Sequence, residues 1–116
     1  MSNDKHITDT EWAICEKYDS KIAAVSPNGR IGIALKTMTQ HPTNGLRHPP
    51  HGNMCGWYIW GGEYSADPNF FQVLHVEHIA KHYPDLFKLL SLEPGFRFLI
   101  DGTYLDVWFD EQLLNI

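Results

Sequence analysis

The clearest pattern of hydrophobic and polar positions lies near the C-terminus, in residues 94–110. Apolar residues alternate with other residues on both sides of the dipeptide Asp101-Gly102, which is typical of a tight β-hairpin. In the first strand, Phe96, Phe98 and Ile100 share one face. The matching apolar set on the second strand is Leu105, Val107 and Phe109. Because an isolated hairpin is only marginally stable in water, the rest of the chain must cover one face of it.

Two further strands are predicted earlier in the chain. In residues 30–38, the side chains of Ile31, Ile33 and Leu35 alternate with other residues and share one face. Residues 54–60 form a continuous apolar and aromatic run that ends at a pair of glycines, which is typical of a buried strand. We expect both strands in the same sheet as the hairpin.

The segments around the first of these strands are less regular. Residues 22–25 have the composition to begin a strand, and the turn signal Asn28-Gly29 after them predicts a hairpin. Residues 39–54 contain three prolines, two glycines and three histidines without periodicity. We therefore expect a long loop over residues 39–54, of the kind that is often functional.

Helices are predicted at the N-terminus and before the C-terminal hairpin. Thr8 and Glu11 have the spacing of a capping box, and Asp19 is expected to end the helix that they begin. Residues 70–83 have a helical pattern, and Pro84 separates them from a second short helix. The apolar stripe of that second helix consists of Leu86, Phe87, Leu89 and Leu90.

Strands and helices are mixed without the regular order of a parallel β-α-β sheet, which predicts an α+β fold. The length of 116 residues fits a single domain over residues 1–116. We expect a mostly antiparallel β-sheet packed against a few short helices near residues 70–91. Its predicted strands include residues 31–37, 55–60, 96–101 and 104–109. Its predicted core residues are Trp57 or Tyr58, Phe96, Phe98 and Val107.

Composition narrows the classes of function. The formal net charge of −5 argues against a nucleic-acid-binding protein, which would show a basic stripe. Two cysteines, Cys15 and Cys55, are too few for a disulfide framework, and we expect both thiols to stay reduced. The N-terminus lacks the apolar run of a signal peptide, and no stretch has the length to span a bilayer. We therefore expect a cytoplasmic protein with neither a nucleic-acid nor a membrane partner.

Two groups of histidines are candidates for metal binding. His75, His78 and His82 share one stripe if residues 70–83 are helical, and grouped imidazoles hold zinc or another transition metal. Partly buried structural histidines explain this stripe equally well, because it lies beside apolar residues. The second group has the spacing H-x2-H-x3-C and consists of His48, His51 and Cys55. A complete zinc site needs a fourth ligand, so incidental histidines in a Pro-rich loop are the favoured reading. We expect no metal at either group.

No convincing catalytic set is evident. Cys55 would need an activating histidine to be a nucleophile, but it begins an apolar strand, where buried thiols are commonly inert. Carboxylates are scattered over turns, strand ends and the mixed face of the hairpin: Glu63, Asp67, Asp101, Asp106, Asp110 and Glu111. Scattered carboxylates are typical of a surface, and next to exposed aromatic residues they suit a protein interface. We therefore expect neither an enzyme nor a bound cofactor.

Several stretches resemble the immunity protein 33 domain family of bacterial polymorphic-toxin systems. The first is GWYIWGGE at residues 56–63, which resembles the family's strand with GW and a later G-E. FFQVLHVEH at residues 70–78 and PDLFKLL at residues 84–90 are similar to the helices that follow. The last is LEPGFRFLI at residues 92–100 with DVWFD at residues 106–110, in which Phe96 and Glu93 replace a Trp and a Pro. The resemblance covers roughly residues 54–114.

This resemblance implies a non-catalytic cytoplasmic antidote that neutralises a cognate toxin by tight stoichiometric binding and is a monomer when free. Aromatic residues and carboxylates after the aromatic strand, with histidines of the predicted loop, are the expected toxin-binding residues: Trp60, Glu63, Tyr64, Asp67, His48 and His51. Two alternatives stay open. One is a metal-binding protein or metal-dependent enzyme built on either histidine group, and the other is a general protein-interaction domain.

Overall fold

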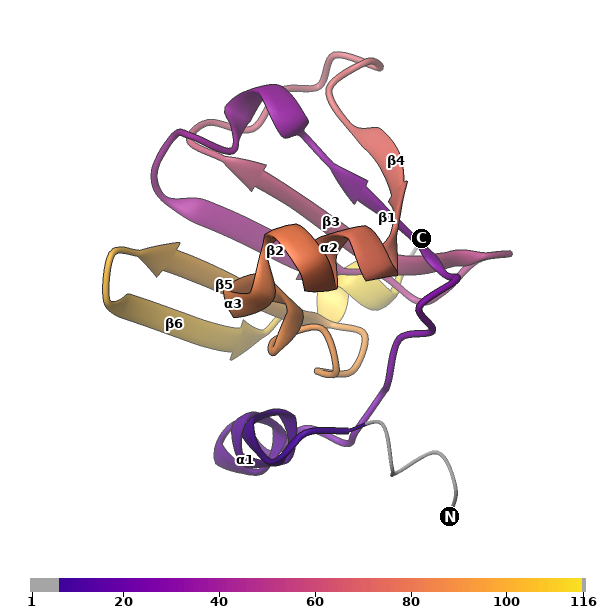
Figure 1. The fold of residues 1–116 in the computed structure, drawn as a ribbon, viewed down its shortest axis with the longest axis vertical. Helices are drawn as coiled ribbons and strands as arrows, with labels where there is room; N and C mark the ends of the chain where they lie inside the picture. Colours follow the sequence, from indigo (N-terminus) through magenta and orange to yellow (C-terminus); the bar gives the residue numbers. More distant parts are fainter. Residues whose placement is uncertain (1–6, 116) are drawn as a thin grey trace.

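A six-stranded sheet forms the centre of the molecule, with the strand order β4-β1-β3-β2-β5-β6 (Figure 1). The structure is a computed structural model, and it describes residues 7–115. All neighbouring strands are antiparallel except β1 and β3, which are parallel. The strands are β1 (Arg30–Ile33), β2 (Thr43–Arg47), β3 (Met54–Gly61), β4 (Gln72–His75), β5 (Phe96–Asp101) and β6 (Tyr104–Phe109). The α+β prediction is confirmed.

The helices are short, and α2 (Val76–His82) and α3 (Pro84–Phe87) cover one face of this sheet (Figure 1). Helix α1 spans Asp9–Lys17, and single 3-10 turns form η2 (Leu35–Thr37) and η3 (Glu111–Leu114). Figure 1 shows α2 and α3 in front of the sheet, α1 below it and the yellow turn η3 behind it. Apolar side chains of the helices and of the sheet's covered face form one core, in which Trp57, Phe96, Phe98 and Val107 are buried. The core prediction is therefore confirmed, with Trp57 rather than Tyr58 inside.

The predicted capping box begins α1. Thr8 Oγ1 accepts a hydrogen bond from the backbone N–H of Glu11, and the Glu11 carboxylate accepts one from the backbone N–H of Thr8. The same carboxylate is buried and accepts a 2.6 Å hydrogen bond from Ser91 Oγ. A buried carboxylate needs such partners. The cap therefore also attaches α1 to the segment after α3.

Strand β2 lies in the centre of the sheet, where the sequence predicted only a loop over residues 39–54. The prediction was wrong because β2 has no apolar alternation on its covered face. Gly45 leaves room there for the ring of Phe98, and the next covered position is Arg47. Arg47 is only 3% exposed, and its guanidinium donates to the carbonyls of Ala23, Cys55, Leu90 and Leu92. A glycine and a buried arginine thus replace the apolar residues that would have indicated a strand.

Three other expectations about elements need correction. Residues 22–25 form no strand, apart from an isolated bridge between Ile22 and Leu92, so Asn28-Gly29 connects no hairpin. Strand β1 ends at Ile33, and the chain turns into η2. Residues 72–75 are strand β4 rather than helix, because they pair with the free edge of β1.

Candidate functional site

The face of the sheet opposite α2 and α3 carries a row of side chains that crosses all six strands. Residues paired across antiparallel strands point to the same face, so the pairing register identifies the row. In strand order it runs through Val73, Gly32, Tyr58, Leu46, Arg97 and Trp108. We call this face of the sheet the open face. Val73 and Trp108, at its two ends, are 55% and 38% exposed.

Six rings pack against one another along β3 on the open face. We call them the aromatic cluster: His48, Tyr58, Trp60, Tyr64, Phe70 and Phe71. The ring centroids of His48 and Tyr58 lie 5.9 Å apart, and those of Tyr58 and Phe71 lie 5.3 Å apart. Trp60 contacts Tyr64 and Phe71 in edge-to-face geometry. Such contacts hold each ring in a fixed orientation, so the cluster is preorganised for binding.

The loop over residues 62–71 presents the outer part of this cluster. Asp67 begins a turn in which its Oδ1 accepts a hydrogen bond from the N–H of Asn69 and its carbonyl accepts one from the N–H of Phe70. The Gln72 side chain then joins this turn to the start of η2, because it donates to Asn69 O and accepts from the N–H of Leu35. These hydrogen bonds support the exposed ring of Tyr64, which is 60% exposed.

The structure separates the residues that the sequence proposed for toxin binding. Glu63, Tyr64 and Asp67 are all exposed in the loop after β3. Trp60 is only 6% exposed beneath Tyr64 and Phe71, so it supports the surface rather than forming it. The two histidines belong to the other end of β3. His48 lies in the aromatic cluster with Nδ1 2.9 Å from the carbonyl oxygen of Leu113, and His51 is exposed in the β2–β3 connection.

Three cluster members were not proposed for the site from the sequence: Tyr58, Phe70 and Phe71. Tyr58 was considered only for the core. Phe70 and Phe71 were assigned to a helix, in which adjacent residues point in different directions. The structure instead places them just before β4, where their ring centroids lie 4.9 Å apart and both contact Tyr64. The aromatic pair Phe70-Phe71, directly after the turn signal Asp67-Pro68-Asn69, was the signal that could have revealed this.

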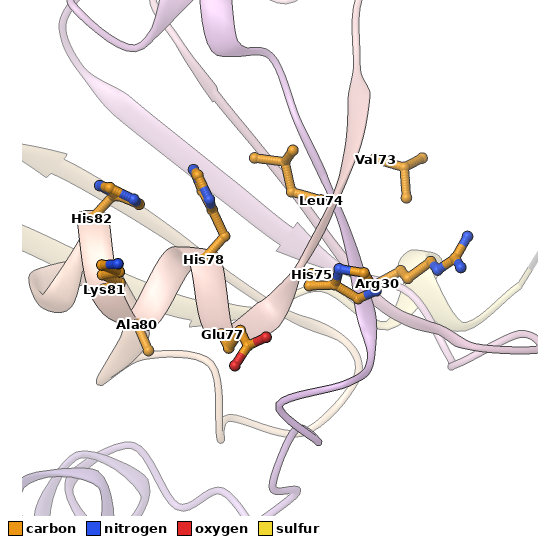
Figure 2. Close-up of a pocket in the computed structure, with 9 residues that line it drawn as sticks. All are labelled: Arg30, Val73, Leu74, His75, Glu77, His78, Ala80, Lys81 and His82. Carbon is orange, nitrogen blue, oxygen red and sulfur yellow. The ribbon is translucent and has the colours of Figure 1, made fainter.

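The second group of candidate residues lines an open cleft of about 930 Å³ between β4 and α2 (Figure 2). His75, His78 and His82 all border this cleft and are exposed, so the alternative of partly buried structural histidines is wrong. His78 and His82 lie together on α2 with ring centroids 4.3 Å apart, whereas His75 lies on β4 beside Arg30. Within residues 7–115, no group of three or more His, Cys, Asp or Glu side chains is arranged to hold a metal ion.

Cys55 does not have the environment of a nucleophile. It is a free thiol that is 8% exposed, and burial raises its pKa, with a smaller opposing contribution from the backbone of Trp57 and from Arg47. A catalytic thiol needs a lowered pKa, because the thiolate is the reactive form. Within the described residues, His48, His51 and Cys55 are not arranged as a group that could hold a metal ion.

The family model of the Imm33-like domain matches residues 10–110. The chain therefore belongs to the Imm33-like family. The match includes the whole aromatic cluster and the loop over residues 62–71, and it extends the sequence resemblance through the N-terminal third. No curated protein and no solved structure matches this Imm33-like chain. None of the helices in the described residues has both the length and the apolar character to cross a membrane.

Proposed function

We propose that this Imm33-like protein is a non-catalytic immunity protein that neutralises a cognate toxin in the bacterial cytoplasm. The observation that carries the proposal is the family match over residues 10–110. An immunity protein needs no chemistry of its own, because occupying the toxin is sufficient. Burial raises the pKa of the thiols of Cys15 and Cys55, which opposes a nucleophilic role for them. The exposed carboxylates Glu63 and Asp67 suit a contact surface.

The proposed contact surface is the loop over residues 62–71 with the aromatic cluster beneath it. An antidote must dissociate slowly from its toxin, and slow dissociation comes from a few well-packed aromatic anchors. Tyr64 is the exposed ring of the cluster, and Trp60, Phe70 and Phe71 hold it in place. Preorganised rings lose little conformational entropy on binding, so the contact can be tight.

The proposed partner surface is basic. Glu63 and Asp67 are exposed on the same loop as Tyr64, and the chain carries a net charge of −5. Carboxylates around an aromatic anchor accelerate association with a positively charged partner. Net negative charge also opposes self-association, in agreement with a free monomer that forms a one-to-one complex with the toxin.

Co-expression with the toxin encoded beside this gene tests the proposal. Wild-type protein is expected to protect the cell and to co-purify with the toxin at equal stoichiometry. The variant Glu63→Lys/Asp67→Lys is expected to protect poorly. The matched control is Glu77→Lys/Asp85→Lys, which makes the same charge change at exposed positions on the helical side and should protect fully.

Each outcome has a distinct meaning. Absence of both protection and a complex with the wild-type protein would refute the immunity function. Full protection by Glu63→Lys/Asp67→Lys would refute the proposed contact surface but leave the function standing. Equal losses in the two charge-reversed variants would show that overall charge, rather than the loop, determines binding.

A further inference from the structure

Strand β6 is an edge strand with one unpaired side. Its only partner in the sheet of the described residues is β5. The N–H of Asp110 donates to the carbonyl of Gly95 at 2.7 Å, which identifies this pair as a hydrogen-bonded one. Hydrogen-bonded and non-hydrogen-bonded residue pairs alternate along an antiparallel ladder. The next residues of β6 that are hydrogen-bonded to β5 are therefore Trp108, Asp106 and Tyr104. The backbone N–H and C=O groups of Leu105, Val107 and Phe109 therefore point away from β5 and toward the edge.

A pocket of about 390 Å³ opens where this edge meets the end of α1. Its apolar lining comes from Tyr18, Phe96, Val107 and the aromatic residues at the end of β6, and its acidic lining residues are Asp19 and Glu93. Glu93 is held in place because its Oε2 accepts a hydrogen bond from the backbone N–H of Lys21 at 3.1 Å. Lys17 Nζ lies 5.4 Å from the centroid of the Tyr18 ring, but Lys17 is not among the residues that line the pocket.

The pocket has the composition that suits a long basic side chain. Lys and Arg place an apolar stem along hydrophobic surface and keep the charged group beside polar partners. Phe96 and Val107 would contact the stem, and the carboxylates of Asp19 and Glu93 would contact the cation. Val107 and Phe109 connect the two features, since their backbones lie on the unpaired edge and both residues line the pocket.

We propose that the edge of β6 binds an extended segment of a basic partner as an added strand, with an Arg or Lys side chain of that segment in the pocket. Backbone hydrogen bonds to an edge strand supply affinity, and a pocket for one side chain supplies specificity. This binding site is separate from the loop over residues 62–71, because that loop follows β3 in the centre of the sheet. It does not depend on the identity of the toxin.

A second copy of this chain is a poorer occupant of the edge. An antiparallel pair of β6 strands would bring two copies of Asp106 to one interface while both chains carry a net charge of −5. Like charges in that position oppose pairing. A basic segment instead neutralises the carboxylates of the pocket and is opposite in sign to the net charge of the chain.

A labelled peptide tests the proposal without any toxin. The probe is an end-capped, fluorescein-labelled peptide in which Val and Thr alternate around one central Arg, and its matched control has Gln in place of the Arg. We expect saturable anisotropy changes with the Arg peptide and binding at least about fivefold weaker with the Gln peptide. Hydrogen exchange should slow at the backbone amides of Leu105, Val107 and Phe109 when the Arg peptide is bound.

Two variants separate the contributions of the pocket and of the backbone edge. Asp19→Asn/Glu93→Gln removes both charges but keeps the side-chain shapes, and Asn tolerates the positive φ of 58° at position 19. It is expected to bind the Arg and Gln peptides equally weakly, whereas Glu77→Gln/Asp85→Asn should behave as wild type. Leu105→Pro removes an outward N–H but no bond to β5, so it should abolish binding.

The outcomes decide the proposal even if Leu105→Pro does not fold, because amide exchange is measured on the wild-type protein. Absence of saturable binding at millimolar peptide, equal affinity for the Arg and Gln peptides, or protection confined to amides outside β6 would each overturn it. A dimer in light scattering that Leu105→Pro converts to a monomer would assign the edge to a second copy and would overturn it as well.

Discussion

The ring of Phe98 on β5 lies directly over Gly45 on β2. The two residues are paired across the strands, and a Cβ atom on Gly45 would fall inside the Phe98 ring's van der Waals contact distance. Phe98 is 1% exposed and also packs against Trp57, with 5.5 Å between ring centroids. The absence of a side chain at position 45 is therefore a requirement of the core.

Gly45→Ala is expected to destabilise the protein by about 1–3 kcal/mol, the usual cost of overpacking a core. Urea denaturation measures this cost. In the background Phe98→Leu, which leaves more room above position 45, the same substitution should cost clearly less. If the two substitutions instead have additive costs, Phe98 is not what requires glycine at position 45.

The Gly45–Phe98 pair also explains the main limit of the sequence prediction. The hairpin of β5 and β6 and the strand β3 were predictable, because their apolar residues alternate or form a continuous run. Strand β2 was not, because its covered side chains are absent at Gly45 and charged at Arg47. Gly45 leaves space for a ring, and Arg47 binds carbonyls that only the complete fold brings together. Neither role produces a pattern in the neighbouring sequence.

The candidate site was predictable to a similar extent. The exposed positions of Glu63, Tyr64 and Asp67 agree with the turn signals around them. The sequence of β3 could not indicate on which face Trp60 lies or whether it is buried, because neither face of the strand is polar. Every residue from Cys55 to Gly61 except Tyr58 is buried. Both faces are covered because the loop over residues 62–71 folds back on the open face, and loop paths leave no periodic signal.

Arg47 is expected to be among the most sensitive positions for stability. Its Nη1 donates to carbonyls of Ala23, Leu90 and Leu92, so it joins β2 to two segments on the helical side. Burial lowers the pKa of this guanidinium, because its charged form is held away from water. Arg47→Met would leave those carbonyls without a donor, and we expect a loss of about 3–5 kcal/mol in a denaturant melt.

The matched control for Arg47 is Arg97→Met. Arg97 pairs with Asp110 at 3.2 Å, but its side chain is 30% exposed, and such pairs contribute about 0–1 kcal/mol. A loss for Arg47→Met no larger than that for Arg97→Met would contradict the assigned role of the buried guanidinium.

The two buried thiols predict a stability change at alkaline pH. Burial raises the pKa of Cys15 and of Cys55 above the ordinary value of 9.0. The stability that this contributes is complete below pH 9.0 and is lost as the pH rises through the raised values, because the unfolded chain ionises first. We expect the free energy of unfolding to fall more steeply above pH 9.0 in wild type than in Cys15→Ala/Cys55→Ala. Parallel curves would show that the thiols do not titrate differently in the two states.

The proposed toxin contact predicts that the anchor and the charges act on different rate constants. Tyr64→Ala removes an exposed ring that the aromatic cluster holds in place, so it should raise koff by about 30-fold, equivalent to about 2 kcal/mol. Glu63→Lys/Asp67→Lys should lower kon about tenfold at low salt and much less at high salt, because salt screens long-range attraction. Surface plasmon resonance with the purified toxin measures both constants.

The control Tyr104→Ala removes an equally exposed tyrosine from the end of the hairpin, since Tyr104 is 59% exposed and Tyr64 is 60% exposed. This variant should leave koff unchanged. Similar effects of Tyr64→Ala and Tyr104→Ala would place the anchor outside the loop over residues 62–71.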